Sequence, residues 1–403
     1  MDFQYLRYLF LNIGHFIDHM FMLIFAKAAF SAGLAFGLGE DGAYAAMIPY
    51  GIPSLILFGA CAPIAAYMAD KWGRNGMIIV FFIGIGLASI CTSFAENPIQ
   101  IAIGLAILGV FAAIYHPVGI AMVVEGGGNI GWRLGANGVW GNMGVAAAPL
   151  ITGLILADFS WRMTFMIPGI IAIVIGIGFL LFVISGNAVP PMATREEKAM
   201  VRFAPGWKRA LSALALVTGA GGFIFGAMTF IVPRMFEIHL PEVSIDVAAT
   251  GALAAIVYAT AAFSQLAVGR IIDRHPVKPV LLFLAAAQPL FLIMMATQSN
   301  LALFFMTLLT MSFVFGQIPI TDTLLSRYVP DVWRAKVLSI KVMLNLVVGS
   351  LALLIARYIL ETGGSFHGIL LVLSGAGLIL FLAAILLPRQ PTPHAIVDAT
   401  PAK

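Results

Sequence analysis

Apolar residues gather in long runs along this chain, and short polar segments separate the runs. We distinguish twelve such runs of about 20 residues, the length that an α-helix needs to cross the hydrocarbon core of a bilayer. The expected helices are residues 5–33, 44–69, 77–95, 98–122, 134–157, 162–185, 209–235, 246–269, 278–297, 301–325, 336–360 and 367–388. The pattern predicts an all-α membrane protein with twelve transmembrane helices.

Composition supports this prediction. Hydrophobic residues make up 61% of the chain and charged residues only 10%, which excludes an ordinary soluble domain. Cys61 and Cys91 fall in different apolar runs, so we interpret them as small buried hydrophobes rather than a metal pair. The first run lacks a basic leader and contains His15, and we therefore expect it to remain as a span rather than be cleaved.

Charges are distributed unevenly between the loops on the two sides of the predicted membrane. The basic loops hold Lys71 and Arg74, Arg133, and residues 195–209, 270–278 and 327–336. The opposite loops are acidic or nearly uncharged. Because basic loops stay in the cytoplasm, we expect a multi-pass protein of the cell membrane with both termini cytoplasmic.

One long polar connection precedes the C-terminal tail, and it divides the chain. We expect an N-terminal six-helix bundle at 1–185, a cytoplasmic linker at 186–208, a C-terminal six-helix bundle at 209–388 and a cytoplasmic tail at 389–403. The net charge of +4 comes from the loops, so it does not indicate a nucleic-acid partner.

The two halves share three landmarks at an offset of roughly 202 residues. The landmarks pair Asp70-Lys71 with Asp273-Arg274, Tyr115-His116-Pro117 with Gln317-Ile318-Pro319, and Trp132-Arg133 with Trp333-Arg334. Their common order indicates an internal duplication. Parallel six-helix repeats about an axis along the membrane normal are typical of one large class of secondary transporters.

Residues 66–74, Ala-Tyr-Met-Ala-Asp-Lys-Trp-Gly-Arg, resemble the GxLADRxGR loop of the major facilitator superfamily, with Ala66 in place of the usual glycine. A shortened version occupies residues 269–274, and the resemblance extends over the entire chain. It implies two pseudo-symmetric six-helix bundles and a secondary transporter. It also implies gating roles for the loop charges Asp70, Lys71, Arg74, Asp273 and Arg274. The alternative is that these charges only set the topology.

Two further segments narrow the resemblance. His-Phe-Ile-Asp at 15–18, together with Tyr-His-Pro at 115–117, resembles the fosmidomycin-resistance-like branch, whose members are linked to proton-driven export. The fifth helix contains Gly138, Gly141, Gly144 and Pro149, and it resembles the Gly/Pro-rich fifth helix of antiporters in the superfamily. Ordinary close helix packing explains the same small residues.

Ionisable residues inside a span are costly and are therefore hypotheses of function. Asp18 lies one turn from His15 and beside His19, and a histidine near a carboxylate in an apolar site is suited to proton exchange. The full set of candidate proton-coupling or substrate residues is Asn12, His15, Asp18, His19, Tyr115, His116, Asn142, Gln317, Asp322, Lys341 and Asn345. Asn137 and Trp140 are expected to line the same polar cavity.

Three alternatives remain open for the polar residues of the first helix and for Lys341. The first-helix group can be a structural polar network. It can also bind a metal, because His15, Asp18, His19 and Met22 offer suitable ligand atoms, although no second ligand set accompanies them. Lys341 can either extend to the cytoplasmic interface or face the cavity, where it favours an anionic substrate or an ion pair with Asp322.

Function is predicted from these features together. No GxxxxGK[ST] loop or hydrolase motif occurs, so we expect neither an ATP-driven pump nor an enzyme, and no cofactor. A receptor or channel-like protein is the other class, but the repeated gate loops favour a carrier. We predict a monomeric, proton-coupled exporter of a small solute, with proton-coupled uptake of a small solute, metal ion or metal chelate as the alternative.

Overall fold

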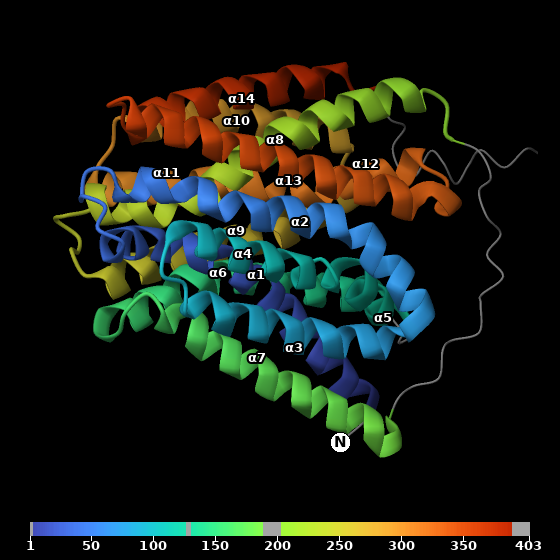
Figure 1. The fold of residues 1–403 in the computed structure, drawn as a ribbon. Helices are drawn as coiled ribbons and strands as arrows, with labels where there is room; N and C mark the ends of the chain where they lie inside the picture. Colours follow the sequence, from blue (N-terminus) through green and yellow to red (C-terminus); the bar gives the residue numbers. More distant parts are fainter. Residues whose placement is uncertain (1–2, 126–129, 188–202, 389–403) are drawn as a thin grey trace, which may run out of the picture. The chain divides into compact units, whose positions relative to one another are not determined.

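The computed structural model describes residues 3–125, 130–187 and 203–388. The predicted tail at 389–403 and most of the predicted linker lie outside these residues. Every regular element within the described ranges is helical (Figure 1). The elements are α1 (Phe3–Ala35), α2 (Ala43–Trp72), α3 (Arg74–Ser93), α4 (Pro98–Ala112), η1 (Tyr115–Gly119), α5 (Ile120–Glu125), α6 (Ile130–Asp158), α7 (Met163–Phe182), η2 (Val183–Asn187), α8 (Trp207–His239), α9 (Val247–Arg274), α10 (Val277–Ala296), α11 (Asn300–Gly316), α12 (Ile318–Tyr328), α13 (Asp331–Glu361) and α14 (Phe366–Leu386).

The predicted number of membrane spans is confirmed. Among the described residues, 12 helical segments are long and apolar enough to cross a membrane, and each coincides with one of the predicted runs. The largest boundary differences lie in α9, which ends at Arg274 rather than near residue 269, and in α13, which begins at Asp331 rather than near residue 336. Long apolar runs were sufficient to locate these helices because the bilayer imposes a minimum length on each of them.

Two spans are interrupted at positions that the internal repeat pairs with each other. The fourth span passes from α4 through the π-helical turn η1 into α5, and the tenth passes from α11 into α12 at Gln317. Pro117 lies in η1 and Pro319 is the second residue of α12. Both interruptions thus lie beside a proline, which lacks the backbone N–H of the helical ladder, although Pro49 and Pro149 lie within continuous helices.

Contacts between Cα atoms group the chain into two compact units. Unit 1 comprises residues 1–196, 229–259 and 353–364, and unit 2 comprises residues 197–228, 260–352 and 365–403. Unit 1 thus combines the first six spans with the adjoining ends of α8, α9 and α13. The predicted six-plus-six division of the sequence stays a prediction.

Within unit 1, α1 packs along α6, α3 along α7 and α2 along α4. Glycine makes the first of these approaches possible. A Cβ atom built on Gly144 of α6 lies 2.1 Å from the backbone oxygen of Phe16 in α1, and one built on Gly141 lies 2.6 Å from the ring of His15. The small residues of α6 therefore bring its backbone against the polar face of α1.

Within unit 2, α10 packs along α14, and the two lie side by side in Figure 1. Apolar side chains from α8 to α12 and α14 form a buried core there, which includes Leu281, Leu324 and Leu380. Gln317 follows α11 directly and is only 5% exposed, so the interruption of the tenth span carries an amide into the interior.

Candidate functional site

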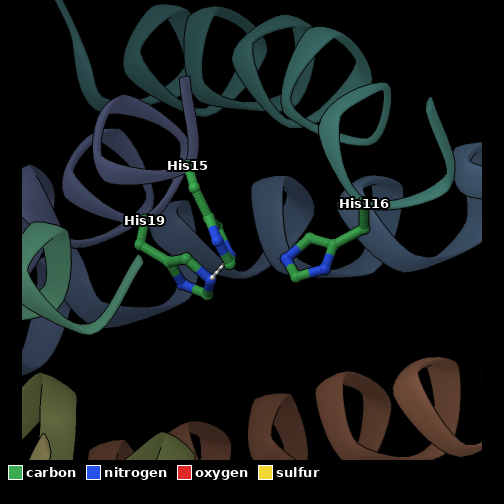
Figure 2. Close-up of side chains that lie close together, drawn as sticks. All are labelled: His15, His19 and His116. Carbon is green, nitrogen blue, oxygen red and sulfur yellow. Dashed lines mark hydrogen bonds between the residues drawn. The ribbon is translucent and has the colours of Figure 1, made fainter. Parts of the chain in front are cut away.

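Three histidines converge in unit 1. His15 and His19 lie on successive turns of α1, and His116 comes from η1 (Figure 2). Each offers one ring nitrogen to a group of atoms that lie within 4.8 Å of one another. The Nε2 atoms of His15 and His19 are 3.2 Å apart, which is a hydrogen-bond distance. The structure therefore places the polar face of α1 beside the Tyr-His-Pro segment at 115–117.

Asp18 lies beside the histidines and is completely buried. Its side chain is 0% exposed, and neither carboxylate oxygen has a hydrogen-bond partner among the described residues. The nearest basic atom is His116 Nε2, 3.5 Å from Asp18 Oδ2. A charged carboxylate without such partners is costly away from water, so a proton on Asp18 or on His116 compensates the charge.

A hydrogen-bonded network lies behind His15 and ties it to α6 and η1. Asn137, which is 1% exposed, places its backbone oxygen 2.8 Å and its Oδ1 2.9 Å from His15 Nδ1. Its Nδ2 donates to Asn12 Oδ1 and to the hydroxyl oxygen of Tyr115, each at 2.9 Å. The Tyr115 hydroxyl donates to the backbone oxygen of Leu11 at 2.6 Å.

The three residues of this network are buried. Asn12, Tyr115 and Asn137 are at most 5% exposed, and their hydrogen bonds connect them with one another and with His15. Sequence reasoning grouped Asn12 and Tyr115 with the substrate contacts, because a pattern of polar residues does not reveal which member is covered. Their pairing does realise the structural polar network considered as an alternative.

Trp140 also differs from expectation. It lines a separate cavity of about 290 Å³ together with Phe16, Ile17, Ile171 and other apolar residues of α1, α6 and α7. The lining is apolar, and Ile171 and Trp140 are 51% and 37% exposed. Trp140 therefore faces an apolar groove rather than the polar cavity predicted for it, while Asn142 is half-buried on the same helix.

The histidine group also meets one requirement of a transition-metal site, since imidazole nitrogens are common ligands of such ions. Nδ1 of His15 faces two oxygens of Asn137, so the nitrogen left to bind an ion is Nε2. This Nε2 lies at hydrogen-bond distance from Nε2 of His19. Asp18 does not join the close group of ring nitrogens. The cluster therefore offers three imidazole nitrogens to an ion, whereas the carboxylate of Asp18 lies outside this close group.

In unit 2, Lys341 of α13 forms an ion pair with Asp322 of α12. The side chain of Lys341 is 14% exposed and that of Asp322 is 50% exposed. The expected pairing is therefore present. Gln317 accepts a hydrogen bond at 3.1 Å from Gln288, which is fully buried. Asn345 of α13 packs closely against α8, because a Cβ built on Gly222 would lie 2.7 Å from the backbone oxygen of Asn345.

The loop charges expected to act in gating are exposed: Asp70, Lys71, Arg74, Asp273 and Arg274. Arg74 pairs with Glu125, the last residue of α5, and Glu125 also pairs with Arg7 of α1 at 3.1 Å. Sequence reasoning missed Glu125 because it ends an apolar run and resembles any other acid at a helix terminus. Its two basic partners connect the loop between α2 and α3 with α1.

A second group of charged residues lies at the C-terminal end of α8, and this end belongs to unit 1. Lys27 of α1 contacts Glu237 at 2.5 Å and Thr250 of α9 at 3.0 Å, and its side chain is 1% exposed. Arg234 donates to the other carboxylate oxygen of Glu237 at 2.7 Å and lies 3.4 Å from the centre of the Phe30 ring. These charges bind α1 to the ends of α8 and α9, which residue type alone did not show.

These features define a class: an all-α protein of 12 candidate spans with a repeated helix interruption and a buried carboxylate among histidines. The sequence model of the Major Facilitator Superfamily matches residues 10–316 and 240–402. The chain belongs to the Major Facilitator Superfamily of membrane transporters.

Two relatives of known sequence illustrate this membership. The puromycin resistance protein pur8 of Streptomyces alboniger is 33% identical over 110 residues, which cover 27% of this chain and 22% of that protein. The multidrug resistance protein MdtG of Proteus mirabilis is 26% identical over 252 residues, covering 60% and 61%. The matches thus span less than two thirds of either relative.

Among solved structures, the chain resembles a bacterial homolog of the human lysosomal transporter Spinster in an inward-facing and unoccupied conformation. The TM-score is 0.71 at 15% identity, and the match covers 96% of this chain and 95% of the other. At this identity the likeness concerns the fold alone.

Proposed function

We propose that this transporter exports a small solute by alternating access and that protons moving in the opposite direction drive the export. The observation that carries the proposal is the buried Asp18, which is 0% exposed and lies 3.5 Å from Nε2 of His116, a member of the three-histidine cluster. An ionisable residue in a span costs about 2.5 to 3.5 kcal/mol on insertion scales, so its presence calls for a function.

The chemistry of the group suits proton exchange. Imidazole is the side chain whose unperturbed pKa lies nearest to neutral pH. Asp18 supplies a carboxylate 3.5 Å from Nε2 of His116. Several positive charges cannot gather in so small a buried space without strong repulsion. Gain of a proton by one member therefore changes the charge and the hydrogen bonds of the others, which is what coupling to a conformational change requires.

The direction of transport is inferred from the relatives. Both pur8 and MdtG are named as resistance proteins, which supports export rather than uptake. For this chain we propose an organic solute as substrate. Asp322, Lys341 and Asn345 are half-buried or exposed, so they are our candidates for contact with it.

The loop charges are proposed to act as a gate. Glu125 holds Arg74 and Arg7 at once, so movement of the loop between α2 and α3 changes the environment of α1. Asp70, Lys71, Asp273 and Arg274 are exposed and able to form alternative ion pairs as the helices move. We further propose a monomer in the cell membrane with cytoplasmic termini. The even number of spans among the described residues and the basic loops support this position of the termini.

The proposal is tested in liposomes that contain the purified protein and a pH-sensitive dye. A panel of organic cations, anions and neutral drugs is added, and solute-dependent proton flux is compared between the parent, Asp18→Asn and Asp158→Asn. Asp158 is an exposed carboxylate at the end of α6 and serves as the matched control. We expect proton flux opposite to solute flux in the parent and the control, and none in Asp18→Asn. Solute flux that moves no protons in the parent contradicts the proposal.

A further inference from the structure

The hydrogen-bond network behind His15 determines where its hydrogen lies. The hydroxyl of Tyr115 donates to the backbone oxygen of Leu11 at 2.6 Å, so the phenol oxygen can only accept from Asn137. Asn137 must therefore turn its Nδ2 toward Tyr115 and Asn12. The amide oxygen of Asn137 is thereby directed at His15.

His15 Nδ1 consequently faces two oxygens that carry no hydrogen, the backbone oxygen and Oδ1 of Asn137, at 2.8 and 2.9 Å. Only a ring with its hydrogen on Nδ1 satisfies both contacts. In the neutral ring, Nε2 then carries the lone pair. His19 Nε2, 3.2 Å away, must be the donor to it.

We propose that Asn137 is a positioning residue that keeps the hydrogen of neutral His15 on Nδ1, so that Nε2 is the single proton-accepting atom of this ring. When Nε2 of His15 gains a proton, the Nε2 atoms of His15 and His19 both carry hydrogen, and the hydrogen bond between them breaks. The proton added to Nε2 is then free to donate to another acceptor in the cluster. This inference deepens the proposed proton coupling and rests on it for its functional meaning.

The surroundings of His15 are consistent with such a switch. The titratable groups in contact with its ring are His19 of α1 and Tyr115 and His116 of η1. Asp18 of α1 lies next to His116, with Oδ2 3.5 Å from His116 Nε2. Tyr115 stacks on the His15 ring with centroids 4.8 Å apart, so the ring is held on one face by an aromatic side chain and at Nδ1 by α6. The Asp18 carboxylate, whose oxygens lack hydrogen-bond partners among the described residues, lies beside His116, the third histidine of the cluster.

The test is nitrogen-15 NMR of histidine-labelled protein in nanodiscs without substrate. His15 is assigned among the seven histidines by the signals lost in His15→Gln. We expect neutral His15 to carry its hydrogen on Nδ1. A hydrogen on Nε2 overturns the proposal. Because no transport is measured, this result does not depend on whether transport is proton-coupled, so failure of the two proposals can be distinguished.

A pair of variants tests the role of Asn137 itself. Asn137→Leu removes Oδ1 but leaves the backbone oxygen, so we expect the Nε2–H form of His15 to rise about fivefold, as loss of one neutral hydrogen bond implies. The pH midpoint of proton-driven transport should move with it. The control is Thr152→Val on α6, whose buried hydroxyl has no hydrogen-bond partner in the described part of the chain, and neither quantity should change. An unchanged tautomer ratio in Asn137→Leu contradicts the positioning role.

Discussion

The buried pair between Lys27 and Glu237 makes a quantitative prediction about stability. Glu237→Gln removes the charge that compensates both Lys27, whose side chain is 1% exposed, and Arg234 at 16%. Breaking one side of a buried ion pair typically costs 3 to 5 kcal/mol, and the amide oxygen of glutamine can retain one contact. We therefore expect a loss of about 3 kcal/mol in the free energy of unfolding.

Lys27→Met perturbs the same pair from the other side. Glu237 keeps its 2.7 Å contact with Arg234, so no buried charge is left without a partner. We expect a loss of about 1 to 2 kcal/mol, close to that of a single charged hydrogen bond. The double variant Lys27→Met with Glu237→Gln has no uncompensated Lys27. Its loss in the free energy of unfolding should therefore be about 1 to 2 kcal/mol smaller than the sum of the two single losses.

The assay is reversible unfolding in mixed micelles with increasing denaturing detergent, followed by tryptophan fluorescence. The reasoning predicts that Glu237→Gln is the more damaging single change and that the double variant recovers part of the loss. Equal losses that add without coupling would refute it, because they would mean that the pair behaves like two independent exposed charges.

Two further changes test the packing of α1. Glu125→Gln should destabilise the protein more than Arg74→Gln in the same unfolding assay, because Glu125 also pairs with Arg7, whose side chain is 8% exposed against 43% for that of Arg74. The reverse order of stability losses would contradict the shared role of Glu125. Gly144→Ala places a Cβ 2.1 Å from a backbone oxygen of α1 and should lower the free energy of unfolding by several kcal/mol. The control Gly138→Ala, whose Cβ meets nothing within 4 Å, should change it by about 0.5 kcal/mol or less, and similar effects of the two variants would argue against close contact between α1 and α6.

The helices could be predicted because each membrane span needs a long apolar run, which leaves a direct mark in the sequence. The interruptions near Pro117 and Pro319 lie at positions that the internal repeat already paired. The spacing of His15, Asp18 and His19 placed these residues on neighbouring turns of one helix.

The supporting residues were harder to find. Asn137 and Glu125 acquire their roles from contacts with residues more than a hundred positions away, and no local pattern reveals such contacts. Trp140 lies on the same helix as Asn137 but faces an apolar groove, since neighbouring positions on a helix point in different directions. Local periodicity thus identifies a polar face but not which of its members is buried beneath the others.

Whether Asp18 couples protons to transport is decided by comparing two modes of transport in the same liposomes. Solute exchange at equal pH on both sides needs binding and alternating access, whereas uphill accumulation driven by a pH gradient also needs proton coupling. The account predicts that Asp18→Asn keeps exchange and loses gradient-driven accumulation, because only the proton-binding carboxylate is removed. Accumulation by Asp18→Asn equal to that of the parent would contradict the claim that Asp18 couples protons to transport.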